Sequence, residues 1–179
     1  YDESGNQTGQ FVSCLEDKLF QPAGFNWRAK YDKGNLVEKV YLNNVKEPYL
    51  NPNEGYAKYI AKYNERGRLI ELSFFDTEEK PCLNNKGYAK VSYGYDEWGN
   101  VTEILFLGVD GKPCTDSSGV ARCVMRYDER GNKIEEATFD PEGNPCLNAQ
   151  GAAKMTAVCD SWGNVTEMTY WGTDGRLGL

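Results

Sequence analysis

A six-residue stretch, Tyr127 to Asn132, recurs along this chain at a fixed interval and constrains its fold more than any other feature. The residues that open successive copies are spaced by 32 positions; they are Tyr31, Tyr63, Tyr95, Tyr127 and Cys159. Self-similarity at a fixed period of this length is the signature of a repeat protein, in which each unit buries its apolar face against its neighbours. The sequence therefore predicts an array of repeats without a single central core.

The same spacing gives the expected boundaries of the copies. Four full copies are expected at about 25–55, 56–87, 88–119 and 120–151, after a degenerate copy over 1–24 and before a truncated copy over 152–179. No linker or low-complexity segment separates them, so we predict one repeat array over 1–179. Because the chain opens in the middle of a motif, we expect it to be a fragment of a longer protein.

The residues before each opening tyrosine alternate between apolar and polar types. The apolar set in one copy is Ala89, Val91, Tyr93 and Tyr95. A period of two with aromatic and β-branched residues indicates a half-buried strand. The Asp-x-x-Gly-Asn segment that follows is typical of a three-residue hairpin loop, in which Gly supplies the left-handed conformation of a bulge. The predicted fold class is all-β, with tandem 32-residue antiparallel hairpins in an elongated, curved sheet or repeat array.

The copy at Tyr31 has one residue fewer in its loop and tests the hairpin interpretation. A two-residue loop of Lys33 and Gly34 keeps Tyr31 opposite Leu36. A slip of one residue would move every side chain of a strand to the other face of the sheet. A shorter turn that preserves the register is therefore what hairpins require.

Five glutamates occupy one column of the repeat: Glu38, Glu71, Glu103, Glu135 and Glu167. With Tyr95 opposite Val101, continuous pairing puts Tyr93 opposite Glu103 and predicts the column on the apolar face. It is either a metal- or sugar-binding row, or a set of rim carboxylates that meet Tyr hydroxyls or Lys and Arg of neighbouring strands. Antiparallel strands separate these charges by roughly 10–14 Å, whereas a parallel stack would place them about 4.8 Å apart.

A short apolar segment, Pro145-Cys146-Leu147 in one copy, lies between two further turns. It is either a third strand or an ordered loop. Its cysteine column holds Cys82, Cys114 and Cys146, and Tyr49 occupies this position in another copy. A position that accepts such different residues is an apolar wall position, so we expect free thiols there. The state of Cys14, Cys123 and Cys159 is left open.

Composition excludes several classes of function. The net charge of -7 argues against binding to nucleic acid or to anionic membranes. No segment approaches the roughly 20 apolar residues that span a bilayer, so no membrane insertion is expected. The absence of histidine removes the commonest general base and metal ligand. We therefore expect no catalytic site, no metal site and no cofactor.

The pattern Tyr-Asp-x-x-Gly-(Asn/Arg)-x-x-x-Glu of Tyr127–Glu136, with its variant at Tyr63–Leu69, resembles the YD repeat of bacterial Rhs-type proteins. The resemblance covers nearly the whole chain. It implies β-hairpins that continue into long curved sheets on large secreted or surface proteins, some of which enclose a toxin domain, and it implies no catalytic residues. The chain departs from the family in its regular 32-residue period and its added Pro-Cys-Leu segment, and it is too short for a closed shell.

The residue at the tip of the first loop alternates between arginine and tryptophan, in the order Arg66, Trp98, Arg130 and Trp162. An odd number of strands per copy, or an ancestral duplication, would produce this deeper period of 64 residues. Exposed tryptophans on repeated hairpins can stack on sugars or cations. Alternatively, each indole folds back onto the neighbouring copy. Arginine and tryptophan are also frequent at binding hot spots, so we predict these four residues as a shallow binding surface without an enclosed polar cleft.

The predicted function is a non-catalytic repeat scaffold or interaction surface of a bacterial secreted or surface protein, with a protein or glycan as partner. The alternative is a carbohydrate- or cell-wall-binding module that uses aromatic residues at the hairpin tips. Tryptophan tips exposed in one row favour the binding module, and buried tips favour the scaffold. An enzyme has the least support, because no histidine and no convergent acid–base pair is found in the sequence.

Overall fold

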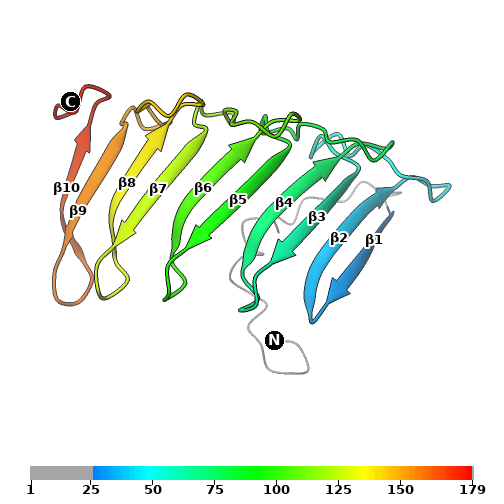
Figure 1. Ribbon diagram of the computed structural model, residues 1–179, viewed down its shortest axis with the longest axis horizontal. Coiled ribbons are helices and arrows are strands. Elements are labelled where there is room, and N and C mark those ends of the chain that lie inside the picture. The colour runs from blue at the N-terminus through cyan, green and yellow to red at the C-terminus, as the bar shows by residue number, and fades with distance from the viewer. Residues whose placement is uncertain (1–25, 179) are drawn as a thin grey trace.

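The computed structural model describes residues 26–178, and the described part of the chain is all β. Ten strands form one open sheet in which each strand lies beside its neighbours in sequence (Figure 1). The strands are β1 (Asn26–Asp32), β2 (Asn35–Leu42), β3 (Lys58–Tyr63), β4 (Leu69–Phe75), β5 (Lys90–Tyr95), β6 (Val101–Leu107), β7 (Arg122–Tyr127), β8 (Lys133–Phe139), β9 (Lys154–Cys159) and β10 (Val165–Trp171). The predicted copy at 1–24 and Cys14 lie outside the described residues.

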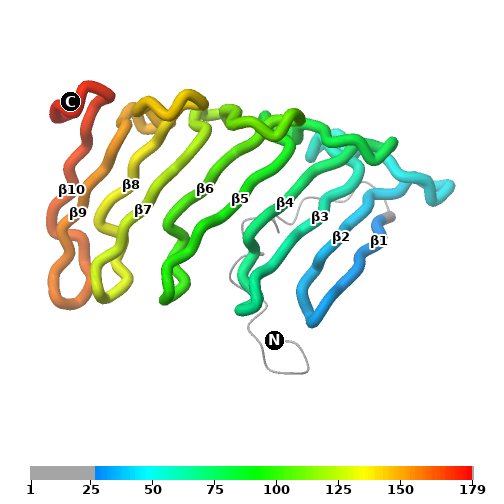
Figure 2. The backbone as a smooth tube through the Cα atoms, in the orientation of Figure 1, coloured from blue at the N-terminus to red at the C-terminus, as the bar shows by residue number. Residues whose placement is uncertain are grey.

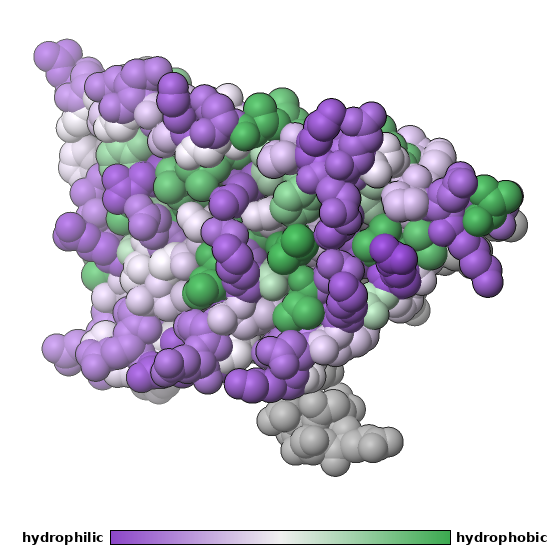
Figure 3. Space-filling view, turned by 45° about the vertical axis from the view of Figure 1, so that its right-hand side comes forward, coloured by the Kyte–Doolittle hydropathy of each residue, from purple (hydrophilic) through white to green (hydrophobic). Residues whose placement is uncertain are grey.

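Every neighbouring pair of strands is antiparallel, which confirms the predicted fold class. The backbone tube in Figure 2 shows hairpins that follow one another along an open, curved sheet. All hairpin loops lie at one end of the strands, and we call the border of the sheet that they form the tip edge (Figure 1). The longer connecting segments lie at the opposite end of the strands. Hydrophilic residues gather along both edges in Figure 3, and hydrophobic groups show between them.

The hairpin loops have the predicted three-residue form. In the copy that opens at Tyr127, the amide of Asp128 donates to the carbonyl oxygen of Asn132, and the amide of Gly131 donates to the carbonyl oxygen of Asp128, each at 3.0 Å. Gly131 has a φ of +83°, the left-handed conformation that glycine adopts without strain. The carboxylate of Asp128 accepts from the amides of Arg130 and Asn132, at 2.9 and 2.8 Å, and so fixes the turn.

The shortened loop also behaves as predicted. Tyr31 pairs with Leu36 across a two-residue turn. Lys33 and Gly34 have φ values of +50° and +83°, which is the mirror-image turn that suits the twist of a tight hairpin. The deletion therefore changes the turn and leaves the register intact.

One prediction about the register is wrong. Tyr95 pairs with Val101 as expected, but Tyr93 pairs with Ile104 and not with Glu103, because Thr102 is an extra residue in the second strand. Each hairpin has a register shift at this place. A β-bulge of this kind moves all later side chains of its strand to the other face. The glutamate column thus lies on the face opposite the core, which we call the charged face.

The core lies on the other face of the sheet, the apolar face, near the connecting segments. Val91, only 1% exposed, is at its centre with Leu72 and Phe74. Tyr56 and Tyr88, at the ends of two connecting segments, pack their rings against the strand aromatics, and the Tyr56 and Phe74 centroids are 4.6 Å apart. Each copy thus covers part of the next, as a repeat array requires.

The Pro-Cys-Leu segment is an ordered loop and not a third strand. It touches the sheet through an isolated bridge between Phe75 and Pro81, and the amide of Cys82 donates to the carbonyl oxygen of Phe74 at 3.1 Å. Since each copy contributes two strands, an odd number of strands cannot explain the alternation of tip residues. The thiols of the column are free; they belong to Cys82, Cys114 and Cys146.

Successive hairpins pair with one another over only part of their length. Between β2 and β3, for example, registered pairs run from Glu38–Ile60 to Val40–Lys58, and the tip-side residues are unpaired. The hydroxyl of Tyr63 reaches across this gap and donates to the carbonyl oxygen of Leu36 at 3.1 Å. Tyrosine side chains therefore link the hairpins on the tip side, where the backbone ladder between them has ended.

Candidate functional site

The predicted tip residues lie on the hairpin loops along the tip edge of the sheet. Trp98 is 72% exposed and Trp162 is 86% exposed, and both are among the most exposed large apolar side chains of residues 26–178. Neither indole is therefore buried against a neighbouring copy, as the packing alternative required. Both rings are exposed on one edge, which by the criterion drawn from the sequence favours the carbohydrate- or cell-wall-binding module over the scaffold.

The two tip arginines have a structural task that sequence reasoning missed. A guanidinium nitrogen of Arg66 donates to the carbonyl oxygen of Glu97 at 2.7 Å, and Arg130 donates in the same way to Ser161. In both cases the acceptor directly precedes a tip tryptophan. Arg68 adds a bond of 3.0 Å to the carbonyl oxygen of Trp98. Each arginine copy thus holds the loop of the tryptophan copy that follows it.

This contact gives a physical meaning to the 64-residue period. The alternation pairs one loop that donates a side chain with one loop that receives it. The signal in the sequence was the constant order, with Arg66 one copy before Trp98 and Arg130 one copy before Trp162. Recognising the contact also required the distance between adjacent loops, which only the structure provides.

The tryptophan loops are further fixed from within. The carboxylate of Asp96 accepts hydrogen bonds from the amides of Gly99 and Asn100, at 2.7 and 2.8 Å, and from the side-chain amide of Asn100 at 2.9 Å. Burial acts to raise the pKa of Asp96, but these hydrogen bonds outweigh it and lower the pKa from its ordinary value. Because the carboxylate is ionised at neutral pH, the loop presents Trp98 in a fixed backbone conformation.

The charged face carries a second set of polar residues. Glu71 lies between the ammonium groups of Lys62, at 2.8 Å, and Lys90, at 3.4 Å. Lys62 belongs to the same hairpin as Glu71 and Lys90 to the next, so the carboxylate ties two copies together. Burial raises the pKa of Glu71, but its bonds to Lys62 and the charge of Lys90 outweigh this effect and lower the pKa overall. Of the two alternatives for the column, carboxylates paired with Lys and Arg are confirmed for Glu38, Glu71, Glu103 and Glu135.

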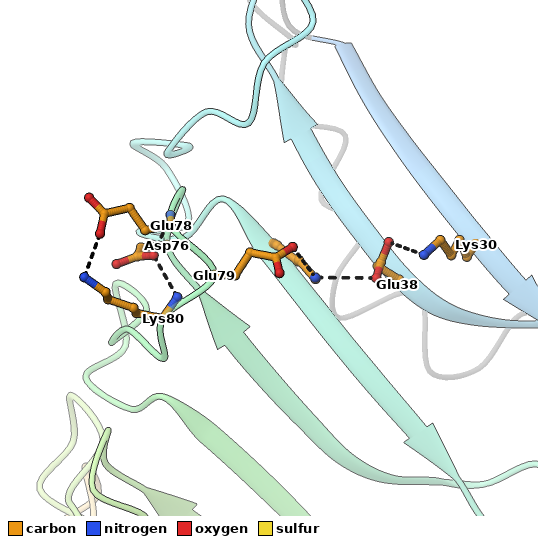
Figure 4. A network of polar contacts seen from close by, with 7 residues as sticks. Lys30, Glu38, Asp76, Glu78, Glu79 and Lys80 are labelled. Atoms are coloured by element: carbon orange, nitrogen blue, oxygen red, sulfur yellow. Dashed lines mark hydrogen bonds and ion pairs between the residues drawn. The ribbon is translucent and has the colours of Figure 1, made fainter.

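The same arrangement recurs at two further glutamates of the column. Glu38 pairs with Lys30 and Lys58, and Glu135 pairs with Arg126 and Lys154. Figure 4 shows the first of these networks, with Glu38 between Lys30 and a second ammonium group that also meets Glu79. The hydroxyls of Tyr63, Tyr95 and Tyr127 donate instead to backbone carbonyl oxygens of the preceding hairpin.

Two half-open grooves lie on the charged face beside this column. One has a volume of about 370 Å³ and includes Glu71, Phe75 and Lys90 in its wall. The other has a volume of about 450 Å³ and includes Glu135 and Phe139. Both grooves are partly open and have largely apolar walls, so the tip residues remain the broad candidate surface.

Residues 26–178 contain no cluster of metal-ligating side chains. No three carboxylate or thiol side chains there lie close enough together to hold a metal ion. No helix in this range is long and apolar enough to cross a membrane.

Comparison with solved structures finds proteins of much greater length. The crystal structure of TcdB2-TccC3 is 16% identical over 86% of this chain, with a TM-score of 0.43. The crystal structure of TcdB2-TccC3 without its hypervariable C-terminal region is 17% identical over 85% of this chain, also with a TM-score of 0.43. This chain spans 8% of the length of each matching chain. No protein-family model and no curated protein sequence matches the chain.

Proposed function

We propose that this chain is a non-catalytic repeat scaffold that presents its tip edge to a partner protein. The observation that carries the proposal is that arginines alternate with the exposed tryptophans along this edge, and that each arginine holds the loop of the tryptophan copy that follows it. Exposed tryptophans alone would favour the carbohydrate-binding alternative. A large aromatic side chain that is exposed on a fixed loop contributes contact area with little loss of conformational freedom on binding. Tryptophan and arginine are also the side chains most often found at hot spots.

The repeat makes weak contacts effective. Arg66, Trp98, Arg130 and Trp162 recur along one edge of a continuous sheet, so a partner that contacts one loop meets the next at a high effective concentration. No single tip residue should then be indispensable. A secreted or surface location in a bacterium belongs to this proposal and rests on the resemblance to YD repeats.

A site-specific crosslinker tests the proposal. A photo-reactive residue at the exposed tip position Glu129 should crosslink the partner, whereas the same residue at Leu147, in an exposed connecting segment, should not. Adding the changes Trp98→Ala and Trp162→Ala should reduce the crosslinked product at least tenfold. Equal crosslinking from both positions would contradict the proposal.

The same crosslinking experiment distinguishes a protein partner from the carbohydrate-binding alternative. If the crosslinked partner is a glycoprotein and enzymatic removal of its glycans abolishes crosslinking from Glu129, the tips bind sugar. If crosslinking survives deglycosylation, the tips bind polypeptide, as proposed here.

A further inference from the structure

The two grooves on the charged face are equivalent sites in copies that lie two repeats apart. Their shared positions are Glu71 and Glu135, Phe75 and Phe139, Pro81 and Pro145, Lys90 and Lys154, and Gly111 and Gly175, each pair separated by 64 residues. We call them the Phe75 groove and the Phe139 groove. Each lies between one hairpin and the first strand of the next, and a turn of the next connecting segment forms part of its wall.

Beside each groove, one carboxylate of the glutamate column is bonded to two cations. In the Phe75 groove, Glu71 is the single carboxylate between Lys62 and Lys90. In the Phe139 groove, Glu135 lies in the same way between Arg126 and Lys154. The turns that carry Gly111 and Gly175 each have one acidic and one basic residue, which pair with each other; they are Asp110 with Lys112 and Asp174 with Arg176.

The first interface between hairpins, between β2 and β3, has the same cations but one more carboxylate. Lys58, which corresponds to Lys90 and Lys154, bonds both to Glu38, at 3.6 Å, and to Glu79, at 2.9 Å. Figure 4 shows this ammonium group lying between the two glutamates. The side chain of Lys58 is 14% exposed, against 35% for Lys90 and 40% for Lys154. The second carboxylate therefore covers a lysine that the two grooves leave accessible.

Glu79 comes from the turn position that glycine occupies at both grooves. Its backbone has a φ of +63°, close to the values of +76° at Gly111 and +73° at Gly175. A Cβ atom placed on either glycine would meet no atom within 4 Å. The space that the Glu79 side chain enters at the first interface is thus open at Gly111 and Gly175.

The third interface, between β6 and β7, has one carboxylate of the column and one cation. Glu103 bonds to Arg122 of the following hairpin. Gly94 stands where the other hairpins have Lys30, Lys62 or Arg126, so the cation on the other side of Glu103 is missing. Among these four interfaces, two cations share a single carboxylate only where the Phe75 and Phe139 grooves lie.

We infer that each groove binds one carboxylate group, which takes the place that Glu79 fills at the first interface. The carboxylate would bond to the ammonium group of Lys90 or Lys154, and the carbon chain that carries it would contact Phe75 or Phe139. Because the group that fills the first interface is a glutamate side chain, the occupant is an acidic side chain of a partner polypeptide. This site is separate from the tip edge and does not depend on the function proposed for it.

Titration of the full chain with a blocked glutamate, N-acetylglutamic acid amide, tests this inference by nuclear magnetic resonance. The amides of Gly111 and Gly175 should shift in a saturable way, with a dissociation constant in the millimolar range for this small probe. N-acetylglutamine amide, which has the same shape but no charge, should bind at least tenfold more weakly. Equal responses to the two probes, or no saturable shift at either glycine, would overturn the inference.

Two opposite variants sharpen the test. Gly111→Glu with Gly175→Glu supplies the missing carboxylate from within and should weaken probe binding at least tenfold. Glu79→Gly empties the first interface and should add a third site, seen as new shifts around residue 79. If the double variant does not fold, Lys90→Met with Lys154→Met replaces it with the same expected loss. Unchanged binding in these variants, or no third site in Glu79→Gly, would contradict the inference.

Titration with glucuronate distinguishes an acidic side chain of a polypeptide from an acidic sugar as the source of the carboxylate. The polypeptide occupant predicts that glucuronate binds no more tightly than the blocked glutamate, because its polar ring does not suit the contact with Phe75 or Phe139. Glucuronate binding at least tenfold tighter would instead assign the grooves to an acidic sugar.

Discussion

The hydroxyl of Tyr95 donates a hydrogen bond of 2.6 Å to the backbone carbonyl oxygen of Leu69 in the preceding hairpin. Tyr127 makes the same bond to Val101 at 2.9 Å. These bonds lie on the tip side of the last registered pair between hairpins, where the strands no longer share a backbone ladder. Tyr63, Tyr95 and Tyr127, which open three of the motifs, therefore each join one copy to the one before it, and this contact gives the recurring tyrosine a structural reason.

Tyr95→Phe should lower the free energy of unfolding by about 1 kcal/mol. The change removes the donor and keeps the ring, so that a partly buried carbonyl oxygen loses its partner. Urea unfolding followed by circular dichroism measures the effect. Tyr31→Phe is the matched control, because Tyr31 is 63% exposed in β1 and should tolerate the change within error. Equal losses in the two variants would show that the hydroxyl of Tyr95 is not the link described here.

Gly55→Ala should destabilise the protein more than Gly119→Ala by at least about 1 kcal/mol. Both glycines have a positive φ, of +82° and +86°, so both variants carry similar backbone strain. Only at Gly55 would the new Cβ collide with the next connecting segment, at 2.8 Å from the backbone nitrogen of Asn85. Comparing the urea concentrations at which the two variants are half unfolded isolates the contribution of packing between copies to stability. Equal midpoints would mean that the connecting segments do not pack as tightly as described.

Stability should decrease as the pH falls below about 4.5. Burial acts to raise the pKa values of Glu38 and Glu71, but their lysine partners outweigh burial, and the folded-state pKa values are lowered from 4.5. A group whose pKa is depressed by folding contributes stability above its unfolded pKa and loses it as the pH falls through its folded pKa.

The double variant Glu38→Gln, Glu71→Gln should therefore be less stable at pH 7 and show a flatter decline below pH 4.5. Glu65→Gln, at an exposed loop position, is the control and should keep the wild-type slope. Thermal unfolding at closely spaced pH values measures both slopes. An unchanged slope in the double variant would exclude these two carboxylates as the source of the acid sensitivity.

Much of the hairpin geometry could be predicted because it depends on local chemistry. The 32-residue period, the glycine of the three-residue loop and the compensated register of Tyr31 with Leu36 all follow from residues close together in sequence. The faces of the first strands were also predicted correctly, since Val91 lies in the core and its neighbour Lys90 lies on the charged face.

The glutamate column could not be placed from the sequence, because one bulged residue decides its face. Thr102 is the extra residue in β6, and a bulge leaves no clear compositional signal there. The contact of Arg66 with the Trp98 loop was missed for another reason: it depends on the distance between neighbouring loops. The sequence did carry one useful signal for the face of the column. The first strand of three hairpins has a cation that the bulge brings opposite a glutamate; these cations are Lys30, Lys62 and Arg126.

The thiols of Cys82, Cys114 and Cys146 should remain reduced in air. They are free in the structure and belong to successive copies. Cys123 should be the slowest to alkylate, because burial raises its pKa to about 12 from 9.0. A shift of this size leaves on the order of 10³-fold less thiolate at pH 8 than in the unfolded chain, and the thiolate is the reacting form. Mass spectrometry after timed alkylation, with native and with urea-unfolded protein, measures the redox state of the thiols and the alkylation rate of Cys123. A mass loss from disulfide formation would contradict the prediction that the three thiols stay reduced.

The central claim is that the contacts between copies hold the array together and leave the tip indoles free. The most direct test is the unfolding of the double variant Trp98→Ala, Trp162→Ala beside Tyr95→Phe. Exposed residues that pack against nothing should change stability by no more than about 0.5 kcal/mol each, with a single cooperative transition. The account predicts a cooperative double variant that is at least as stable as Tyr95→Phe. If the double variant loses cooperative unfolding while Tyr95→Phe retains it, the indoles are packing groups and the account is contradicted.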